Sequence, residues 1–584
     1  MTILKKFLQQ NKGLALLTFV MICLQIAGTL GVPKLVAKLI DTGIASGEAS
    51  VIKKIGVEML LVAFLGTIAA VASSYFSALA SARFGFQTRE KYFHKFQQLS
   101  MKDISRFSSG SLLTRMTNDV DNVQQMIVLF CQMILPAPVI CFFTILMMFR
   151  YSLLLTWVTL FSVVFYVWIV YRLMKRGTPL SLSIQPKMDR ITITLREFFT
   201  GINMIRAFDN QSYEEKRTNQ TFADYASQMI KVNRIFAWVT PIAFLLMGIV
   251  YASILWFGGN LVADGTLQIG VVTAVVEYSM LTLAYLMIAA MVLVIIPKSF
   301  ASLRRIEEIL EAEIEIKEET IQTVAKPSFA QTNAAAFEHV TFKYTETSDP
   351  VLEDIDFTIP KGKTTAIVGG TGSGKSSLAK LLLRLSDPTV GKVTLGGIPL
   401  TQMTQEQIRS HISYVPQKAF LFSGTILSNL QMGNEHALPE ELAKAIKIAQ
   451  LEELVDTLPD GLDSFVAQGG SNYSGGVAQG GSNYSGGQKQ RICIARALIK
   501  PAEIYVFDDS FSALDYKTDA ALRAALHKHM SEKTLVIVAQ RLSTIQQADN
   551  IIVLDEGKIV GQGTHEELLS NCQTYQEFAK SQGI

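Results

Sequence analysis

Six long apolar runs constrain the fold of this 584-residue chain more than any other feature. Each run is long enough to cross about 30 Å of hydrocarbon as a helix. The first is too long for a cleaved signal peptide and has no small-residue cleavage site. Charged residues make up only 18% of the chain, less than is usual for a soluble protein. We therefore expect an α-helical membrane domain with spans at residues 14–40, 55–82, 124–149, 152–172, 236–258 and 270–297.

The distribution of lysine and arginine predicts the orientation of these spans. The connections at 41–52 and 258–270 contain neither residue, whereas the connections at 83–115 and 172–234 are basic. Lys5 and Lys6 precede the first span. By the positive-inside rule, the N-terminus, the two basic connections and the C-terminal half are cytoplasmic. The net charge of +3 is too small to indicate a nucleic-acid partner, and the five cysteines show no metal or disulfide spacing.

The two basic connections are long, and we expect them to continue the membrane helices into the cytoplasm. Each contains a break at which a short transverse helix is predicted, in residues 107–120 and 199–209. These breaks are either plain helix–loop–helix connections or contacts that transmit motion to the C-terminal half, because loops often carry function.

Glu277 stands in the middle of the sixth predicted span. A carboxylate at this depth is costly and suggests a function by default. It either faces a water-filled cavity and meets a cationic substrate, or it is a protonated or hydrogen-bonded packing residue. Glu58 lies near the end of a span, where its side chain is expected to reach the membrane surface.

The composition changes after the last span, which predicts a membrane domain at 1–310, a linker at 311–334 and an α/β domain at 335–584. Residues 369–376 of that domain, between an expected strand and an expected helix, match the phosphate-binding pattern G-x-x-x-x-G-K-[ST]. A glycine-rich turn that binds nothing is the alternative. We predict a nucleoside triphosphate and Mg²⁺ site in which Lys375 reaches the β- and γ-phosphates, the Ser376 hydroxyl binds Mg²⁺, and the phosphate contacts come from Gly369, Gly370, Thr371, Gly372, Ser373, Gly374, Lys375, Ser376 and Ser377.

Further candidate residues follow in the same domain. Asp508 ends an apolar strand and is predicted to hold Mg²⁺ in the manner of a Walker B carboxylate. Gln417 follows another apolar run and is predicted to be a Mg²⁺ ligand that senses the γ-phosphate. Tyr344 is a candidate for stacking on adenine, although a tyrosine on a strand is usually a packing residue. Asp509 is one methylene shorter than the glutamate expected of a general base, and Gln540 cannot carry a proton as a histidine would.

Ser485, Gly486, Gly487 and Gln488 complete a motif specific to one superfamily. Together with the phosphate loop, Gln417 and Asp508, they make the chain resemble an ATP-binding cassette (ABC) half-transporter of the exporter type over its whole length. The resemblance implies that two nucleotide domains pair head to tail. The 485–488 segment would then contact ATP bound to the partner's phosphate loop. It also implies that 107–120 and 199–215 are coupling-helix regions.

The chain departs from the family pattern at two linked positions, Asp509 and Gln540, where glutamate and histidine are usual. This combination resembles the degenerate-site subunit of heterodimeric bacterial multidrug exporters. It implies a second half-transporter as partner, an amphipathic substrate and a bacterial plasma-membrane location. A homodimer, a lipid or peptide exporter, and an ATP-gated regulatory or channel subunit stay open as alternatives.

The sequence also contains a tandem duplication. Residues 466–476 recur word for word as 477–487, a period too short for a fold repeat. Because the second copy runs directly into Gln488, we assign function to that copy and expect the first copy to loop out. Whether the duplication is natural, and whether it impairs the site, stays open.

Overall fold

The computed structural model describes residues 2–100, 103–104, 107–293, 295–314, 316, 327–329, 332–345, 348–467 and 484–583. The chain divides into two compact units. The first comprises Met1–Gln97 and Ser108–Ala312, and the second comprises Gln98–Phe107 and Glu313–Ile584.

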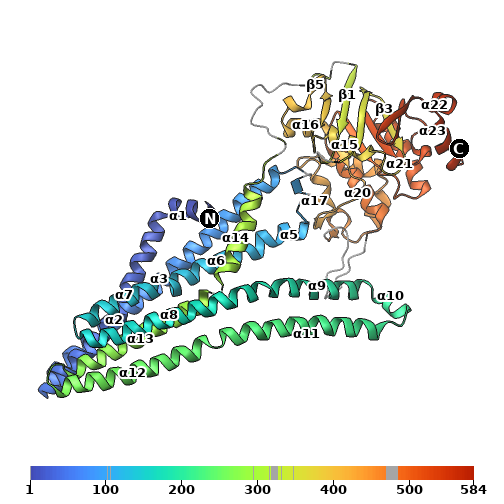
Figure 1. The fold of residues 1–584 in the computed structure, drawn as a ribbon. Coiled ribbons are helices and arrows are strands. Elements are labelled where there is room, and N and C mark those ends of the chain that lie inside the picture. Colours follow the sequence, from blue (N-terminus) through green and yellow to red (C-terminus); the bar gives the residue numbers. More distant parts are fainter. Residues whose placement is uncertain are drawn as a thin grey trace. The chain divides into compact units, whose positions relative to one another are not determined.

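The first unit is all helical (Figure 1). Among the described residues, six helices are long and apolar enough to cross a membrane, and each of the six predicted spans overlaps one of them, although the sixth helix ends at Leu293 and not at 297 as predicted. These helices cover Lys12–Ile44, Ala49–Gln98, Gly110–Phe149, Leu153–Thr200, Gln211–Ala263 and Ile269–Leu293. The constituent segments are α1 (Thr2–Gln10), α2 (Lys12–Lys38), α3 (Ala49–Gln98), α5 (Ser109–Thr114), α6 (Val120–Leu129), α7 (Pro136–Phe149), α8 (Leu153–Leu182), α9 (Ile184–Thr200), α10 (Ile202–Ala207), α11 (Gln211–Phe236), α12 (Val239–Ala263), α13 (Ile269–Leu293) and α14 (Ile296–Leu310).

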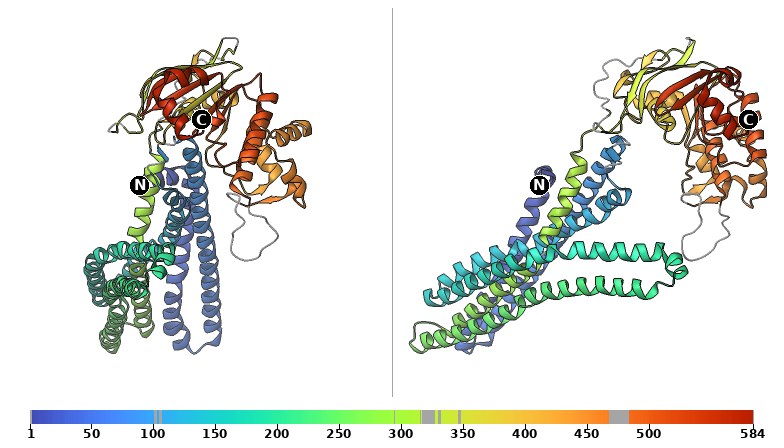
Figure 2. Two further views of the ribbon diagram at one scale, coloured as in Figure 1. Left: turned by 90° about the vertical axis from the view of Figure 1, so that its right-hand side faces the viewer. Right: turned by 45° about the vertical axis from the view of Figure 1, so that its right-hand side comes forward.

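The second basic connection has the expected form. Helices α9 and α11 extend the fourth and fifth spans, lie side by side and are joined by the short α10 (Figure 2). Gly201 and Asn210 border this short helix. The predicted short helix within 199–209 is therefore present.

The first basic connection differs from the prediction. Residues 110–149 form one continuous helix, so 107–120 holds no separate transverse helix and is mostly the start of the third span. The Ser108 hydroxyl accepts a hydrogen bond from the Ser111 amide (3.3 Å) and caps the helix start. The turn over Arg115–Asp119 is π-helical (η2), which widens the helix without ending it.

Helix α13 is the central helix of the bundle and is fixed by hydrogen bonds from buried side chains. The Tyr278 hydroxyl donates to the Leu30 carbonyl of α2 (3.0 Å). Thr282 bonds Thr144 of α7 (2.7 Å), and Ser279 bonds Thr159 of α8 (2.8 Å). Because helices gain little hydrophobic energy by associating in lipid, such bonds are part of what holds them together.

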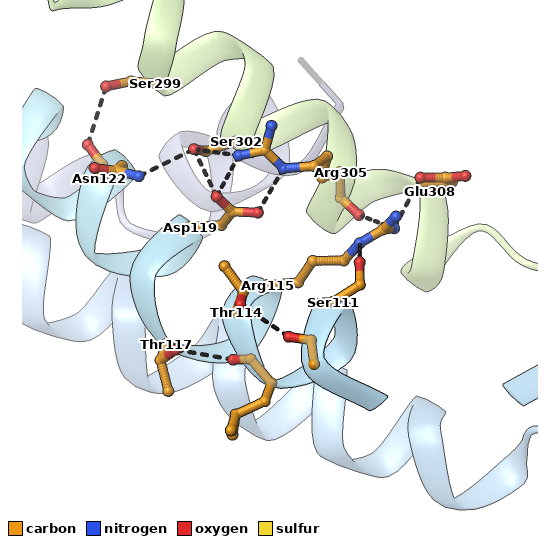
Figure 3. Close-up of polar contacts among 12 residues, drawn as sticks. Ser111, Thr114, Arg115, Thr117, Asp119, Asn122, Ser299, Ser302, Arg305 and Glu308 are labelled. Atoms are coloured by element: carbon orange, nitrogen blue, oxygen red, sulfur yellow. Dashed lines mark hydrogen bonds and ion pairs between the residues drawn. The ribbon is translucent and has the colours of Figure 1, made fainter. Parts of the chain in front are cut away.

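A polar network joins α14 to the start of the third span (Figure 3). Asp119 is only 1% exposed, and its carboxylate accepts hydrogen bonds from Arg305 Nε (2.8 Å), Arg305 Nη2 (2.5 Å) and the Ser302 hydroxyl (2.8 Å). Nearby, Arg115 Nη1 donates to Glu308 (2.8 Å) and to the Arg305 carbonyl (2.9 Å). Asn122 Nδ2 donates to the Ser302 hydroxyl (3.2 Å). The helix that follows the sixth span is thus tied to the third.

The second unit is an α/β domain. In its described part, a six-stranded sheet has the order β12-β11-β3-β10-β9-β6, a four-stranded antiparallel sheet has the order β2-β1-β4-β5, and β7 pairs with β8. The pairs of the six-stranded sheet are parallel, except for β11 with β12. The strands are β1 (Asn333–Phe342), β2 (Leu352–Pro360), β3 (Thr364–Gly369), β4 (Val390–Leu395), β5 (Ile398–Pro399), β6 (Ile412–Val415), β7 (Gly424–Thr425), β8 (Phe465–Val466), β9 (Ile504–Asp508), β10 (Thr534–Ala539), β11 (Asn550–Asp555) and β12 (Lys558–Gly563).

Helices cover the parallel strands and bury two apolar clusters against them. They are α15 (Lys375–Leu382), α16 (Gln405–His411), α17 (Ile426–Gln431), α18 (Pro439–Ile448), α19 (Glu452–Thr457), α20 (Gly486–Ile499), α21 (Tyr516–His529), α22 (His565–Asn571) and α23 (Gln573–Ser581). The central strands β3, β9 and β10 are almost wholly buried. Their C-terminal ends therefore present side chains at one edge of the sheet, where ligands of open α/β sheets bind.

Candidate functional site

The phosphate loop leaves the central strand β3 and enters α15. Gly372 and Gly374 have φ values of +86° and +97°, a region that favours glycine. A side chain on Gly374 would place its Cβ 2.6 Å from Leu352, and one on Gly369 would place it 2.2 Å from the Leu554 carbonyl oxygen. Glycine is therefore required at these positions by backbone conformation or by close packing.

Lys375 lies at the start of α15 and is only 8% exposed. Its Nζ donates to the carbonyl oxygens of Gly369 (2.8 Å) and Gly370 (2.6 Å). Burial lowers the pKa of the Lys375 ammonium, while Asp509 and Asp508 act in the opposite direction. The cation is thus held against the loop itself, at the place where a polyphosphate would lie.

Two of the three predicted magnesium ligands, Ser376 of α15 and Asp508 at the end of β9, meet here. The Ser376 hydroxyl donates to Asp508 Oδ1 (3.0 Å). The other carboxylate oxygen, Oδ2, accepts a hydrogen bond from the Tyr414 hydroxyl (3.1 Å), a contact that our sequence reasoning did not identify. Hydroxyl and carboxylate oxygens suit Mg²⁺, which prefers oxygen ligands, so Ser376 and Asp508 fit the ion that the phosphate loop implies.

Asp509 forms a cluster with Gln417 and Gln540. Its Oδ2 accepts hydrogen bonds from Gln540 Nε2 (2.9 Å) and Gln417 Nε2 (3.2 Å), which come from the ends of β10 and β6. Asp509 has an unusual φ of +47° and is 9% exposed. Burial raises the pKa of its carboxyl group, and the hydrogen bond from Gln417 partly opposes this. The structure therefore brings together the two unusual residues and the predicted γ-phosphate sensor.

Tyr344 lies beside the phosphate-loop helix. Its hydroxyl is 3.0 Å from the Ser377 hydroxyl, and Lys380 Nζ is 5.9 Å from the centre of its ring. The ring packs edge-on against Phe342, with centroids 4.9 Å apart, and the residue is 39% exposed. An accessible aromatic face next to the phosphate loop is compatible with adenine stacking, which stays a prediction.

The 485–488 segment begins α20 with reciprocal capping bonds. The Ser485 hydroxyl accepts from the Gln488 amide (3.2 Å), and Gln488 Oε1 accepts from the Ser485 amide (2.8 Å). A Cβ added at Gly486 would meet no atom within 4 Å, whereas one at Gly487 would lie 3.2 Å from the Ala513 carbonyl. Such a helix start, with an open glycine, suits an anionic phosphate.

The duplication lies partly outside the described residues. Its first residue, Val466, is buried in β8 and pairs with Gly424, so the expectation that the whole first copy loops out is wrong at that residue. This buried position of β8 suits an apolar side chain, and the first copy begins with a valine. The last residues of the second copy, Tyr484–Gly487, lead into α20. Residues 468–483, on which the rest of this prediction falls, lie outside the described part.

Glu277 of α13 lines a cavity of about 700 Å³ in the first unit. The walls come from α2, α3, α12 and α13. They combine apolar side chains, including Met247 and Met280, with the polar Gln25, Thr29 and Thr67. Gly28 and Gly66, which also line it, bring α2 and α3 so close that a Cβ on Gly28 would lie 2.5 Å from Gly66 Cα. Glu277 is thus a half-buried carboxylate on the wall of a mainly apolar chamber.

Each of the two units matches a family of known proteins. Residues 15–286 match the family model of the ABC transporter transmembrane region, and residues 352–512 match that of the ABC transporter domain. An uncharacterized ABC transporter ATP-binding protein of Mycobacterium tuberculosis is 35% identical over 97% of this chain and 96% of its own length. An ATP-dependent lipid A-core flippase of Chromobacterium violaceum is 29% identical over 93% of this chain and 90% of its own length.

Two further likenesses concern exporters. A probable multidrug resistance ABC transporter ATP-binding/permease protein of Bacillus subtilis is 34% identical over 66% of this chain and 64% of its own length. A solved structure of a bacterial Atm1-family ABC exporter with ATP bound covers 98% of each chain, with a TM-score of 0.79 and 25% identity. The chain therefore belongs to the ABC transporter family and is a half-transporter of the ATP-driven exporter type, a multi-pass membrane protein with a cytoplasmic nucleotide-binding domain.

Proposed function

We propose that this chain exports amphipathic, cationic compounds as one subunit of a heterodimer, and that the ATP site built on its own phosphate loop hydrolyses slowly. ABC exporters work as dimers, and the partner would be a second half-transporter. The observation that carries the proposal is the cluster of Asp509 with Gln540 and Gln417.

Slow hydrolysis follows from the chemistry of this cluster. A general base must accept a proton from the attacking water. In this chain the carboxylate is one methylene shorter than glutamate, and two amide donors bind one of its oxygens. Gln540 donates a hydrogen bond but does not exchange a proton as histidine does. ATP would then bind here and close the dimer, with little turnover.

The other composite site would be competent. It would combine the partner's phosphate loop with Ser485 and Gln488 of this chain, whose helix start is intact and capped. Binding of ATP would join the two domains, and hydrolysis at the competent site would part them. The helices α9–α11, with α10 at their end, would carry this motion to the spans.

Glu277 suggests the class of substrate. A carboxylate on the wall of an otherwise largely apolar cavity of about 700 Å³ suits a molecule with a hydrophobic body and a positive charge. The name of the Bacillus subtilis relative supports a multidrug substrate range. The name of the Chromobacterium violaceum relative favours the second candidate, a lipid exporter.

Purification of this chain alone and with its co-purifying half-transporter, identified by mass spectrometry, tests the division of labour. We expect low ATP turnover alone and high turnover in the pair. Rapid turnover by the chain alone would refute the degenerate site.

Transport into proteoliposomes then tests the substrate. We expect Glu277→Gln to reduce uptake of a cationic dye, while Glu58→Gln, at the exposed Lys38 ion pair, leaves it unchanged. Uptake of a labelled lipid in place of the dye would favour the lipid exporter, and ATP-gated conductance without turnover would favour a channel.

A further inference from the structure

A second cavity in the first unit, of about 420 Å³, is separate from the chamber that holds Glu277. Its walls come from α1, the start of α2, α3, the third span and α14. The lining includes Leu4, Phe7, Ala15, Ala80 and Phe300. Nothing in the exporter cycle described above uses this cavity.

The wall of this cavity is almost free of polar groups that a ligand would meet. Of the lining residues in the described part of the chain, Asn11 and Thr18 are the polar ones. Asn11 Nδ2 donates to the Phe7 carbonyl (3.1 Å), and the Thr18 hydroxyl donates to the Leu14 carbonyl (2.8 Å). Since each of these side chains already bonds the backbone carbonyl four residues earlier in the chain, the cavity suits a purely apolar ligand group.

The cavity begins at the cytoplasmic end of the first span. It extends from α1, which precedes the span, to Thr18 within it, and its lining residues Leu8 and Phe19 are 49% and 44% exposed. In the orientation that the positive-inside rule predicts, exposed apolar side chains at this level would face the lipid of the inner leaflet. A lipid chain would therefore enter the cavity directly from the bilayer.

Exposed lysines lie on the N-terminal helices that form part of the cavity wall. Lys5, Lys6 and Lys12 are exposed and adjoin lining residues in the sequence, and α1 contains no acidic residue. Lys298 of α14 is also exposed, but it stands two residues from the lining residues Ile296 and Phe300 and therefore lies on the opposite side of that helix. The nearby carboxylate of Glu307 accepts a hydrogen bond from the Ile3 amide (3.2 Å). This pattern is complementary to an anionic headgroup above an apolar cavity.

We infer that this cavity binds one acyl chain of an anionic phospholipid of the inner leaflet, with the phosphate of that lipid among the lysines. The acyl chain would give the apolar lining residues the dispersion contacts that they lack when the cavity is empty. It would also pack α1 against α14, the helix that follows the sixth span (Figure 1).

Variants that fill the cavity test whether an acyl chain binds in it. Ala15→Phe fills the cavity from α2 and Ala80→Phe fills it from α3, while Ala27→Phe is a matched control at an exposed position of α2. The full transporter is purified in mild detergent from membranes that contain phosphatidylglycerol, and bound lipids are measured by mass spectrometry. We expect the wild type and the control to retain phosphatidylglycerol and both filled variants to lose it. Retention by both filled variants, with normal size-exclusion profiles, would overturn the inference.

A second measurement tests the headgroup. Added phosphatidylglycerol should raise the thermal midpoint of the delipidated transporter in a saturable way, because a ligand of the folded state stabilises it. Lys5→Gln with Lys6→Gln should reduce this shift, whereas Lys53→Gln with Lys54→Gln, at the other end of the membrane, should not. An equal shift with phosphatidylcholine or with a free fatty acid would overturn the assignment to an anionic phospholipid.

Discussion

Replacing Arg305 by methionine should release α14 from the third span. The change keeps the apolar stem of the side chain and removes both hydrogen bonds from Arg305 to Asp119, which leaves the carboxylate with Ser302. Breaking a buried ion pair typically costs about 3–5 kcal/mol. Because the Arg305 side chain is 46% exposed whereas that of Asp119 is 2% exposed, we place the cost at the lower end, about 3 kcal/mol.

Hydrogen exchange measured by mass spectrometry reports this loss locally, because exchange follows the free energy of local opening. A cost of about 3 kcal/mol corresponds to exchange about 150-fold faster in peptides that cover residues 296–310. Arg304→Met, at the adjacent exposed position, is the matched control. Adding Asp119→Asn to Arg305→Met removes the stranded charge and should restore part of the protection. Unchanged exchange in Arg305→Met, or an equal increase in the control, would refute the reasoning.

Four further outcomes are expected. Asp509→Glu combined with Gln540→His should raise ATP turnover of this chain alone by about 100-fold, the lower range for general base catalysis, measured by phosphate release. Lys375→Ala should weaken ATP binding about 10- to 100-fold in a fluorescent-nucleotide titration, because it removes a charge-assisted contact. Burial raises the pKa of Asp509, so its contribution to stability is present in acid and lost as the pH rises through that pKa. Asp509→Asn should therefore raise the thermal midpoint at pH 7, and this gain should shrink toward pH 4. Deleting residues 466–476 places the identical Val477 directly after Phe465, so β8 keeps its valine and the fold should stay intact by circular dichroism; a loss of folded protein would contradict this.

Which residues meet around the phosphate loop was largely predictable, because they lie in local motifs. The phosphate loop fixes Lys375 and Ser376 by spacing alone, and an apolar run that ends in a carboxylate identifies Asp508. Tyr414 was missed because its role depends on the pairing of β6 with β9, in which Tyr414 lies opposite Val506. Strand order in a parallel sheet does not follow from the sequence of either strand.

In the membrane unit, too, local features were predicted from the sequence and contacts between distant residues were not. Apolar length predicted every span, since a helix must be that long to cross a bilayer. The ion pair of Asp119 with Arg305 was not predicted, because the two residues are 186 positions apart and both read as ordinary surface charges. The helix start at Ser109 was also missed. Ser108 is a residue type that often caps helices, but the glycine at position 110 argued against a helix at this place.

The length of the cytoplasmic helices has a mechanical consequence. At a rise of about 1.5 Å per residue, the 26 residues of α11 measure about 39 Å. A rigid rotation of about 5° around the membrane end of that helix would sweep α10 through an arc of about 3 Å. That displacement is as long as a hydrogen bond, so an angular change too small to disturb packing within the spans is large enough to make or break polar contacts at the far tip.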